Sequence, residues 1–187
     1  MTTSFQLELF STPSEVYYDI ETQLSANEVG GWNNIHRMRV SVAVTWCQED
    51  GFKRWDEASV PALIHYLAKF RRIISFNGDG FDTRVLSYYG NVYPVAQRSF
   101  DLLVDLKQRI GRRLGLDSLA RATLGKGKSA DGLTALRWWK EGKIELIAEY
   151  CQQDVQVMVD LVVFAREHGF VKFDDGQAGI KTIAVSW

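Results

Sequence analysis

The sequence predicts a single α/β domain, with a mixed sheet of about five strands, flanking helices and a C-terminal hairpin. Three observations predict this architecture. The chain has 187 residues, which fits one domain with a proper hydrophobic core. Short β-prone runs are followed by helical patterns along the chain. Hydrophobic residues make up 46% and charged residues 24%, a globular composition that argues against a disordered chain.

The first part of the chain predicts an antiparallel meander. Residues 1–14 are expected to form a loosely attached arm, and residues 23–37 are expected to form a loop. Three β-prone runs predict the strands, at residues 16–22, 38–47 and 52–55. Glu49-Asp50-Gly51 marks the turn between the second and third strands.

The rest of the chain predicts further strands that join the sheet in parallel through helical crossovers. A helix is expected to begin at Ser59-Val60-Pro61, with a capping serine and an early proline. A strand is expected at residues 71–77. One helix is expected to begin at residue 81, and another helical stretch is expected over residues 99–110. Residues 115–120 are expected to be a loop that enters a short helix, and further helices are expected over residues 136–139 and 144–168. Residues 170–187 predict a hairpin around Asp174-Asp175-Gly176, whose position against the domain the sequence leaves open.

Composition narrows the class of protein only slightly. The net charge of −1 neither requires nor excludes nucleic acid, because a local basic groove is compatible with a neutral total. Cys47 and Cys151 match no metal or disulfide framework, so we expect free thiols in a reducing cytoplasm. The N-terminus lacks the pattern of a signal peptide, and no apolar run approaches the length of a membrane span. We therefore expect a cytoplasmic protein without a membrane partner.

Two acids lie close together at the end of the first strand. Asp19 and Glu21 are two residues apart, and alternate side chains of a strand point to the same face. Two carboxylates on one face repel each other unless a cation lies between them. The pair indicates a site for a hard divalent cation, Mg²⁺ or Mn²⁺. A solvated strand end is the alternative that the pair alone leaves open.

Two further acids and a tyrosine stand where they can face the same cleft. Asp82 lies where a predicted strand gives way to a helix, a region where functional groups of α/β sheets gather. Asp154 interrupts the apolar face of the long helix, and buried aspartates are rare unless they are paired or bind metal. Tyr150 precedes Asp154 by about one helical turn, so the two side chains are neighbours.

Three segments, taken in their order along the chain, resemble the motifs of the DEDD exonucleases, which are members of the RNase H-like superfamily. Asp19-Ile20-Glu21-Thr22 resembles the first motif, and Asn77-Gly78-Asp79-Gly80-Phe81-Asp82 resembles the second. Tyr150-Cys151-Gln152-Gln153-Asp154 resembles the third motif in its tyrosine-bearing form. The chain therefore resembles the DEDDy branch.

The likeness extends to a segment between the second and third motifs. Leu116-Asp117-Ser118-Leu119-Ala120, followed by Leu124-Gly125-Lys126-Gly127-Lys128, is similar to the linking segment of the proofreading domains of family B DNA polymerases. No polymerase accompanies it, so the chain resembles a stand-alone or excised exonuclease domain. We expect one RNase H-like domain over residues 1–187, with its motif-bearing core at about 16–169 and an extension at 170–187.

The resemblance implies a two-metal site that uses Mg²⁺ or Mn²⁺, with the ions about 4 Å apart. Asp19 would bridge both ions, and Glu21 and Asp154 would complete the first. Asp82 would hold the second ion near the leaving 3′-oxygen. The Tyr150 hydroxyl would orient the attacking water.

Substrate contacts are expected from four residues, Asn77, Trp32, Lys126 and Lys128. Trp32 stacks on a base or simply packs its own loop, and Asn77 contacts substrate or braces its turn. The densest basic run consists of Lys107, Arg109, Arg112 and Arg113, which either follows a phosphate backbone or forms a solvated face. Asp101 and Asp105 are expected to cap or decorate a helix.

The implied activity is 3′-to-5′ exonuclease action on single-stranded nucleic acid, with DNA favoured over RNA. The partners would be the 3′ end of the strand and proteins of a repair assembly. One alternative is a catalytically idle nucleic-acid-binding or scaffold domain of a repair or helicase assembly. Another alternative is endonucleolytic cleavage by the same metal pair.

Overall fold

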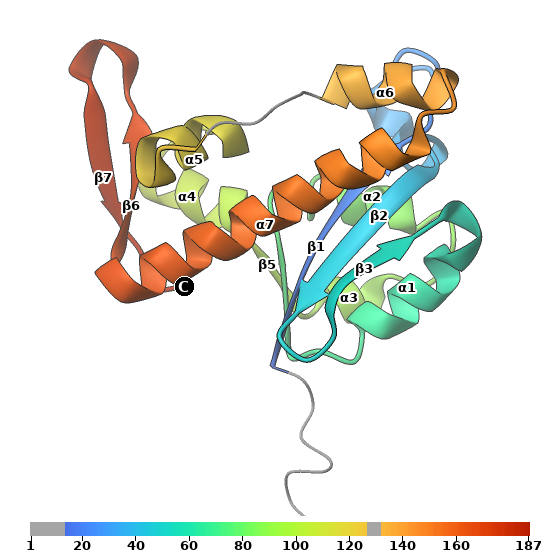
Figure 1. Cartoon of the computed structure of the whole chain (residues 1–187), viewed down its shortest axis with the longest axis horizontal. Coiled ribbons are helices and arrows are strands. Elements are labelled where there is room, and N and C mark those ends of the chain that lie inside the picture. Colours follow the sequence, from blue (N-terminus) through green and yellow to red (C-terminus); the bar gives the residue numbers. More distant parts are fainter. Residues whose placement is uncertain (1–13, 127–131) are drawn as a thin grey trace, which may run out of the picture.

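A five-stranded sheet forms the centre of the protein, whose computed structural model describes residues 14–126 and 132–187. Its strands are β1 (Glu15–Thr22), β2 (Val40–Cys47), β3 (Gly51–Trp55), β4 (Arg72–Ser75) and β5 (Ser99–Asp101). They lie in the order β3-β2-β1-β4-β5 (Figure 1). β1, β2 and β3 form an antiparallel meander, and β4 and β5 are added in parallel beside β1. The predicted mixed sheet is confirmed, with β1 at its centre.

Helices cover both faces of this sheet. One face packs on α1 (Val60–Leu67), α2 (Asp82–Leu86) and α3 (Tyr93–Ala96). The other face packs on α4 (Leu102–Ile110), α5 (Leu116–Leu124), α6 (Gly132–Lys140) and α7 (Ile144–His168). β1 divides its side chains accordingly, because Val16, Tyr18 and Ile20 belong to the first core and Tyr17 to the second.

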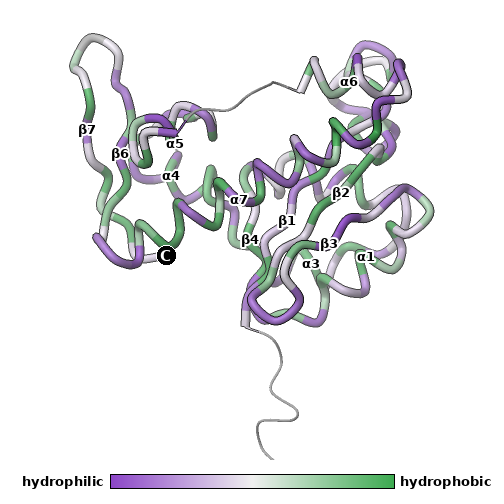
Figure 2. Tube along the Cα trace, viewed as in Figure 1, coloured by the Kyte–Doolittle hydropathy of each residue, from purple (hydrophilic) through white to green (hydrophobic). Residues whose placement is uncertain are grey.

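The predicted long helix is α7, and its hydropathy alternates along its length (Figure 2). Its buried stripe packs over β1 and β2, so it crosses the face of the sheet on which Asp19 and Glu21 lie. α6, predicted only over residues 136–139, is longer and starts at Gly132. None of the helices in the described ranges is long and apolar enough to cross a membrane.

The prediction of one helical stretch over residues 99–110 was wrong at its start. Residues Ser99–Asp101 form β5, and α4 begins only at Leu102. Asp101 marks the boundary because its carboxylate accepts hydrogen bonds from the backbone N–H groups of Leu103 (2.9 Å) and Val104 (3.3 Å). A strand of three residues is too short to show a period of two, so the pattern hid it.

Two smaller features also differ from the prediction. The expected loop over residues 23–37 contains a 3₁₀ helix, Trp32–Arg37. Ser59 precedes α1, but its side chain does not cap that helix. Asp56 instead accepts a hydrogen bond from the Ser59 backbone N–H (2.9 Å) and caps a 3₁₀ turn, Glu57–Ser59. The expected arm lies almost wholly outside the described residues, which begin at Ser14.

The C-terminal hairpin is confirmed, and the structure places it. β6 (Phe170–Asp174) and β7 (Ile180–Ala184) pair antiparallel in a sheet of their own, at the end of α7 that lies away from α6 (Figure 1). The Thr123 hydroxyl of α5 donates to the Lys172 carbonyl and accepts from the Lys172 N–H, both at 2.9 Å. The Trp187 indole N–H donates to Asp105 (2.9 Å). These bonds fix the hairpin against α5 and α4.

Candidate active site

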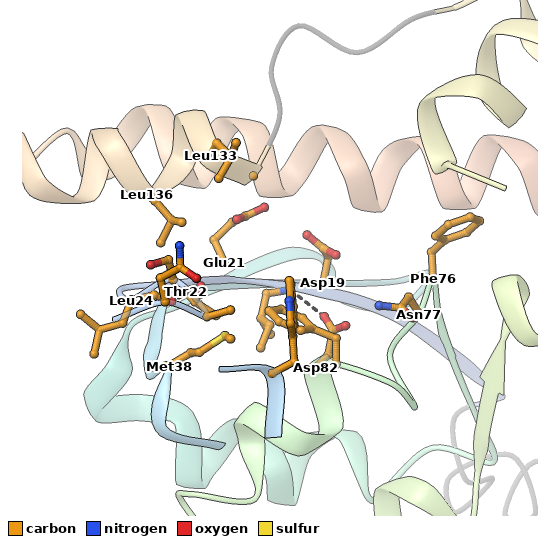
Figure 3. A pocket seen from close by; sticks show the side chains of 17 residues that line it. Asp19, Glu21, Thr22, Leu24, Met38, Phe76, Asn77, Asp82, Leu133 and Leu136 are labelled. Atoms are coloured by element: carbon orange, nitrogen blue, oxygen red, sulfur yellow. Dashed lines mark hydrogen bonds between the residues drawn. The ribbon is translucent and has the colours of Figure 1, made fainter. Parts of the chain in front are cut away.

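Asp19 and Glu21 project from the face of β1 that α7 covers (Figure 3). Both side chains are half-buried. A β-bulge lies immediately beside them, because Glu21 pairs with Val42 and Thr22 pairs with Val40, which leaves Ser41 as an extra residue. Bulges raise the local twist of a strand and re-aim the side chains next to them. The predicted spacing on one face is therefore realised at an irregular strand end.

Asp154 reaches the same point from the middle of α7. Its side chain is buried at 4% exposure. Asp19, Glu21 and Asp154 each offer a carboxylate oxygen, and these three atoms lie within 4.8 Å of one another. Carboxylate oxygens are the ligands that hard divalent cations prefer. The three side chains therefore fit a divalent cation by donor type and by convergence.

Asp82 approaches from the opposite side of β1. It stands at the first residue of α2, is buried, and accepts a hydrogen bond from the backbone N–H of Ile20 at 3.2 Å. Ile20 is the residue between Asp19 and Glu21, so this bond fixes Asp82 beside both acids. Burial, with smaller contributions from the charges of Asp101 and Asp154, raises the pKa of Asp82 to about 7.

Tyr150 and Cys151 lie one turn before Asp154 on α7. The Tyr150 ring is buried and meets Trp138 of α6 edge to face, with 6.4 Å between ring centroids. The Cys151 thiol donates to the backbone carbonyl of Asp19 at 3.3 Å, and it lies 3.5 Å from the Asp19 carboxylate. Burial raises the pKa of this thiol, as does the neighbouring charge of Asp19. The thiol thus ties α7 to β1 beside the acids.

Three of the four acids, Asp19, Glu21 and Asp82, line a cleft of about 620 Å³. Its floor carries Asp19, Glu21 and Asp82, and its walls come from the segment after β1, the turn after β4 and the start of α6. Figure 3 shows apolar Leu24 and Leu136 at one end, Phe76 and Asn77 at the other, and Asp19 between them. The cleft therefore has an aliphatic end, an acidic centre and an opposite end with one aromatic ring and one amide.

Residues 16–166 match the RNase_H superfamily. The chain belongs to this superfamily. No curated protein sequence matches the chain significantly. Among solved structures, it resembles the family B DNA polymerase of the archaeon Pyrobaculum calidifontis, with a TM-score of 0.59 and 20% identity over 81% of this chain. It also resembles the EXO domain of Nibbler from Aedes aegypti, with a TM-score of 0.54 and 17% identity over 87% of this chain.

The two likenesses differ in how much of the other protein they cover. The match spans 24% of the polymerase and 82% of the Nibbler EXO domain. At these identities the two likenesses establish the fold alone, which the chain shares with part of the polymerase and with the Nibbler EXO domain. The predicted resemblance to DEDD exonucleases within the RNase H superfamily is thereby confirmed.

Of the four predicted substrate contacts, two line the cleft of this RNase H domain. Trp32 is 67% exposed there, so it does not simply pack its own loop. Asn77 adopts a left-handed backbone with φ of 71°. Lys126 lies elsewhere, at the end of α5, and its ammonium is 3.1 Å from the Asp160 carboxylate. Lys128 lies outside the described residues.

Sequence reasoning understated two residues beside the cleft. Asp101 caps α4 as predicted, but its carboxylate also accepts from the backbone N–H groups of Asn77 (2.9 Å) and Asp79 (3.1 Å). Arg113, which the sequence presents only as part of a basic run, donates to the Asn77 side-chain oxygen at 3.0 Å. Asp101 ends a strand of three residues that the sequence pattern did not reveal, so no local signal marks its position at this turn. Nothing local indicates that Arg113 reaches this turn.

Proposed function

We propose that this domain is a divalent-metal-dependent exonuclease that removes nucleotides from the 3′ end of a single-stranded nucleic acid, DNA in preference to RNA. One observation carries the proposal. Carboxylate oxygens of Asp19, Glu21 and Asp154 lie within 4.8 Å of one another in an RNase H fold, and Asp19 and Glu21 also line a cleft. Mg²⁺ or Mn²⁺ bound there would supply the positive charge that activates water and stabilises the leaving oxygen.

The side chains of this chain have separable tasks in the proposed reaction. Asp19, Glu21 and Asp154 would hold one ion, with Asp19 shared by a second ion for which Asp82 is the further ligand. Tyr150, one turn from Asp154, would orient the attacking water through its hydroxyl. The leucines at the aliphatic end of the cleft would limit the access of water to one side of the acids. Residues 16–169 would suffice for these tasks, with residues 170–187 as an extension of the same domain.

The experiment uses single-stranded oligonucleotides labelled at the 5′ end, incubated with the protein and Mg²⁺ or Mn²⁺. We expect stepwise shortening from the 3′ end and faster turnover of DNA than of a matched RNA. A covalently closed single strand should stay intact, because an exonuclease needs an end. Absence of shortening with either metal, from folded protein, would refute the proposal and favour an idle binding or scaffold domain. Cleavage of the closed strand would instead indicate an endonuclease.

A further inference from the structure

Among the described residues, no positive side chain lines the cleft where a polyanion would enter it. Its described lining includes three acids, Asp19, Glu21 and Asp82, and no lysine or arginine. Under the proposed function, bound cations compensate the charge of the scissile phosphate. The next phosphate along the strand lies about 6–7 Å away in an extended backbone, so it needs a separate partner. That partner has to be sought at the rim of the cleft.

Arg113 is the basic side chain that the described structure joins to this rim. Its guanidinium donates to the Asn77 side-chain oxygen at 3.0 Å, and Asn77 lines the cleft. The two other arginines of the basic run are engaged elsewhere: Arg109 pairs with Asp105 at 2.8 Å, and Arg112 pairs with Asp175 at 2.6 Å. Within the described ranges, Arg113 has no carboxylate within ion-pair distance.

The turn that carries Asn77 is firmly held. The Asn77 backbone N–H donates to the Asp101 carboxylate, which also accepts from the N–H groups of Asp79 and Leu103. Asp101 is only 4% exposed. One carboxylate thus joins the turn after β4 to the start of α4. The backbone of Asn77 is therefore fixed, and its side-chain oxygen accepts from Arg113 at the end of the cleft opposite Leu24 and Leu136 (Figure 3).

We propose that Arg113 binds a phosphate of the substrate strand one or two nucleotides inward from the scissile bond. The inference rests on the proposed function and names a contact within it. One N–H of Arg113 is held by Asn77, while the guanidinium is exposed and has further donors for phosphate oxygens. The strand then leaves the acidic centre past Asn77. Asp101 and Asn77 are positioning residues for this contact.

The test compares Arg113→Gln with the parent protein and with Arg112→Gln, a matched control that removes an adjacent charge of the same run. Binding of a fluorescent 12-nucleotide single strand is measured by anisotropy in EDTA, from low to moderate salt. We expect Arg113→Gln to raise Kd about 3–10-fold and to reduce the salt slope by about 0.7, the value for one phosphate contact on a single strand. Arg112→Gln should leave both quantities at the parent value, and Arg113→Lys should retain the salt slope.

A second measurement separates a phosphate contact from a loss of structure. The p-nitrophenyl ester of thymidine 5′-monophosphate has one phosphodiester and no inward phosphate. With Mn²⁺, Arg113→Gln should hydrolyse this ester with the kcat/KM of the parent. On the oligonucleotide, the variant should have a higher KM than the parent and the same kcat. An equal loss on both substrates, or an unchanged Kd and salt slope, would overturn the inference.

The two proposals fail in different ways. If the parent protein cleaves neither substrate, the proposed function falls, and the anisotropy series still decides whether Arg113 binds phosphate. If the parent cleaves both substrates and Arg112→Gln weakens binding as much as Arg113→Gln does, the exonuclease stands and the specific contact falls.

Discussion

Replacing Gly78 by alanine should destabilise the turn that leads from β4 to Asp82. A Cβ at this position would lie 2.1 Å from the Ser75 Oγ, 2.6 Å from the Ser75 Cβ and 3.0 Å from the Tyr18 hydroxyl oxygen. Carbon contacts normally begin near 3.5 Å. The Ser75 Cβ cannot rotate away, because it is fixed to the backbone of a buried strand. The turn itself must therefore move.

The expected loss of unfolding free energy in Gly78→Ala is about 1–3 kcal/mol, which is the cost of overpacking a buried site. For a domain of this size, about 1 kcal/mol lowers Tm by roughly 2–4 °C, so the expected fall is about 2–12 °C. Activity should fall too, because the Gly78 carbonyl accepts from the Thr83 N–H at 2.9 Å, at the start of the helix that carries Asp82. Urea unfolding followed by circular dichroism measures the stability loss.

Gly80→Ala is the matched control in the same turn. Its Cβ would meet the Asn77 Oδ1 at 2.9 Å, and that atom ends a side chain that can rotate. We expect a loss below about 1 kcal/mol. Ser75→Gly removes both close atoms, so Ser75→Gly with Gly78→Ala should be more stable than the sum of the single losses. An unfolding midpoint for Gly78→Ala equal to that of the parent would refute the reasoning.

Three further predictions concern the acids and the tyrosine. Tyr150→Phe should keep Tm within about 1 °C of the parent and lower kcat by about 10²–10⁴-fold. A kcat equal to that of the parent would show that the hydroxyl takes no part in catalysis. Asp19→Ala should abolish turnover and Mn²⁺ binding by calorimetry without destabilising the metal-free protein, and retained metal binding would contradict this. Because burial raises the pKa of Asp82 to about 7, while the unfolded chain titrates near 4, the native state binds more protons between these values. The unfolding free energy of the metal-free protein should therefore rise as the pH falls from about 7 to 4, and it should rise less in Asp82→Asn. Urea titrations at several pH values measure this free energy. The same dependence on pH in the parent and in Asp82→Asn would contradict the prediction.

The sequence predicted the acids well because each had a local signal. Asp19 and Glu21 follow the two-residue period of a strand, and that period alone places them on one face. Asp154 was visible as a polar interruption of an apolar helical stripe. Such signals depend on a few neighbouring residues, so they survive whatever tertiary arrangement the chain adopts.

The sequence predicted poorly where position depends on contacts between distant segments. β5 has three residues and exists because Ser99, Phe100 and Asp101 pair with β4. The Asp101 bonds to Asn77 and Asp79 depend on the adjacent ends of two parallel strands. Arg113 reaches Asn77 only through the path of the chain after α4. No window of neighbouring residues contains this information.

The central place of β1 also affects how the protein is made. This strand pairs with β4, and its acids lie beside α7, whose Cys151 contacts Asp19 across 132 residues of sequence. During synthesis from the N-terminus, the first two acids emerge long before the third. A nascent chain shorter than α7 has both carboxylates but no Asp154 to complete the cluster. The proposed hydrolytic centre can therefore assemble only after Asp154 has been translated, because a chain that ends before α7 lacks one of the three clustered carboxylates.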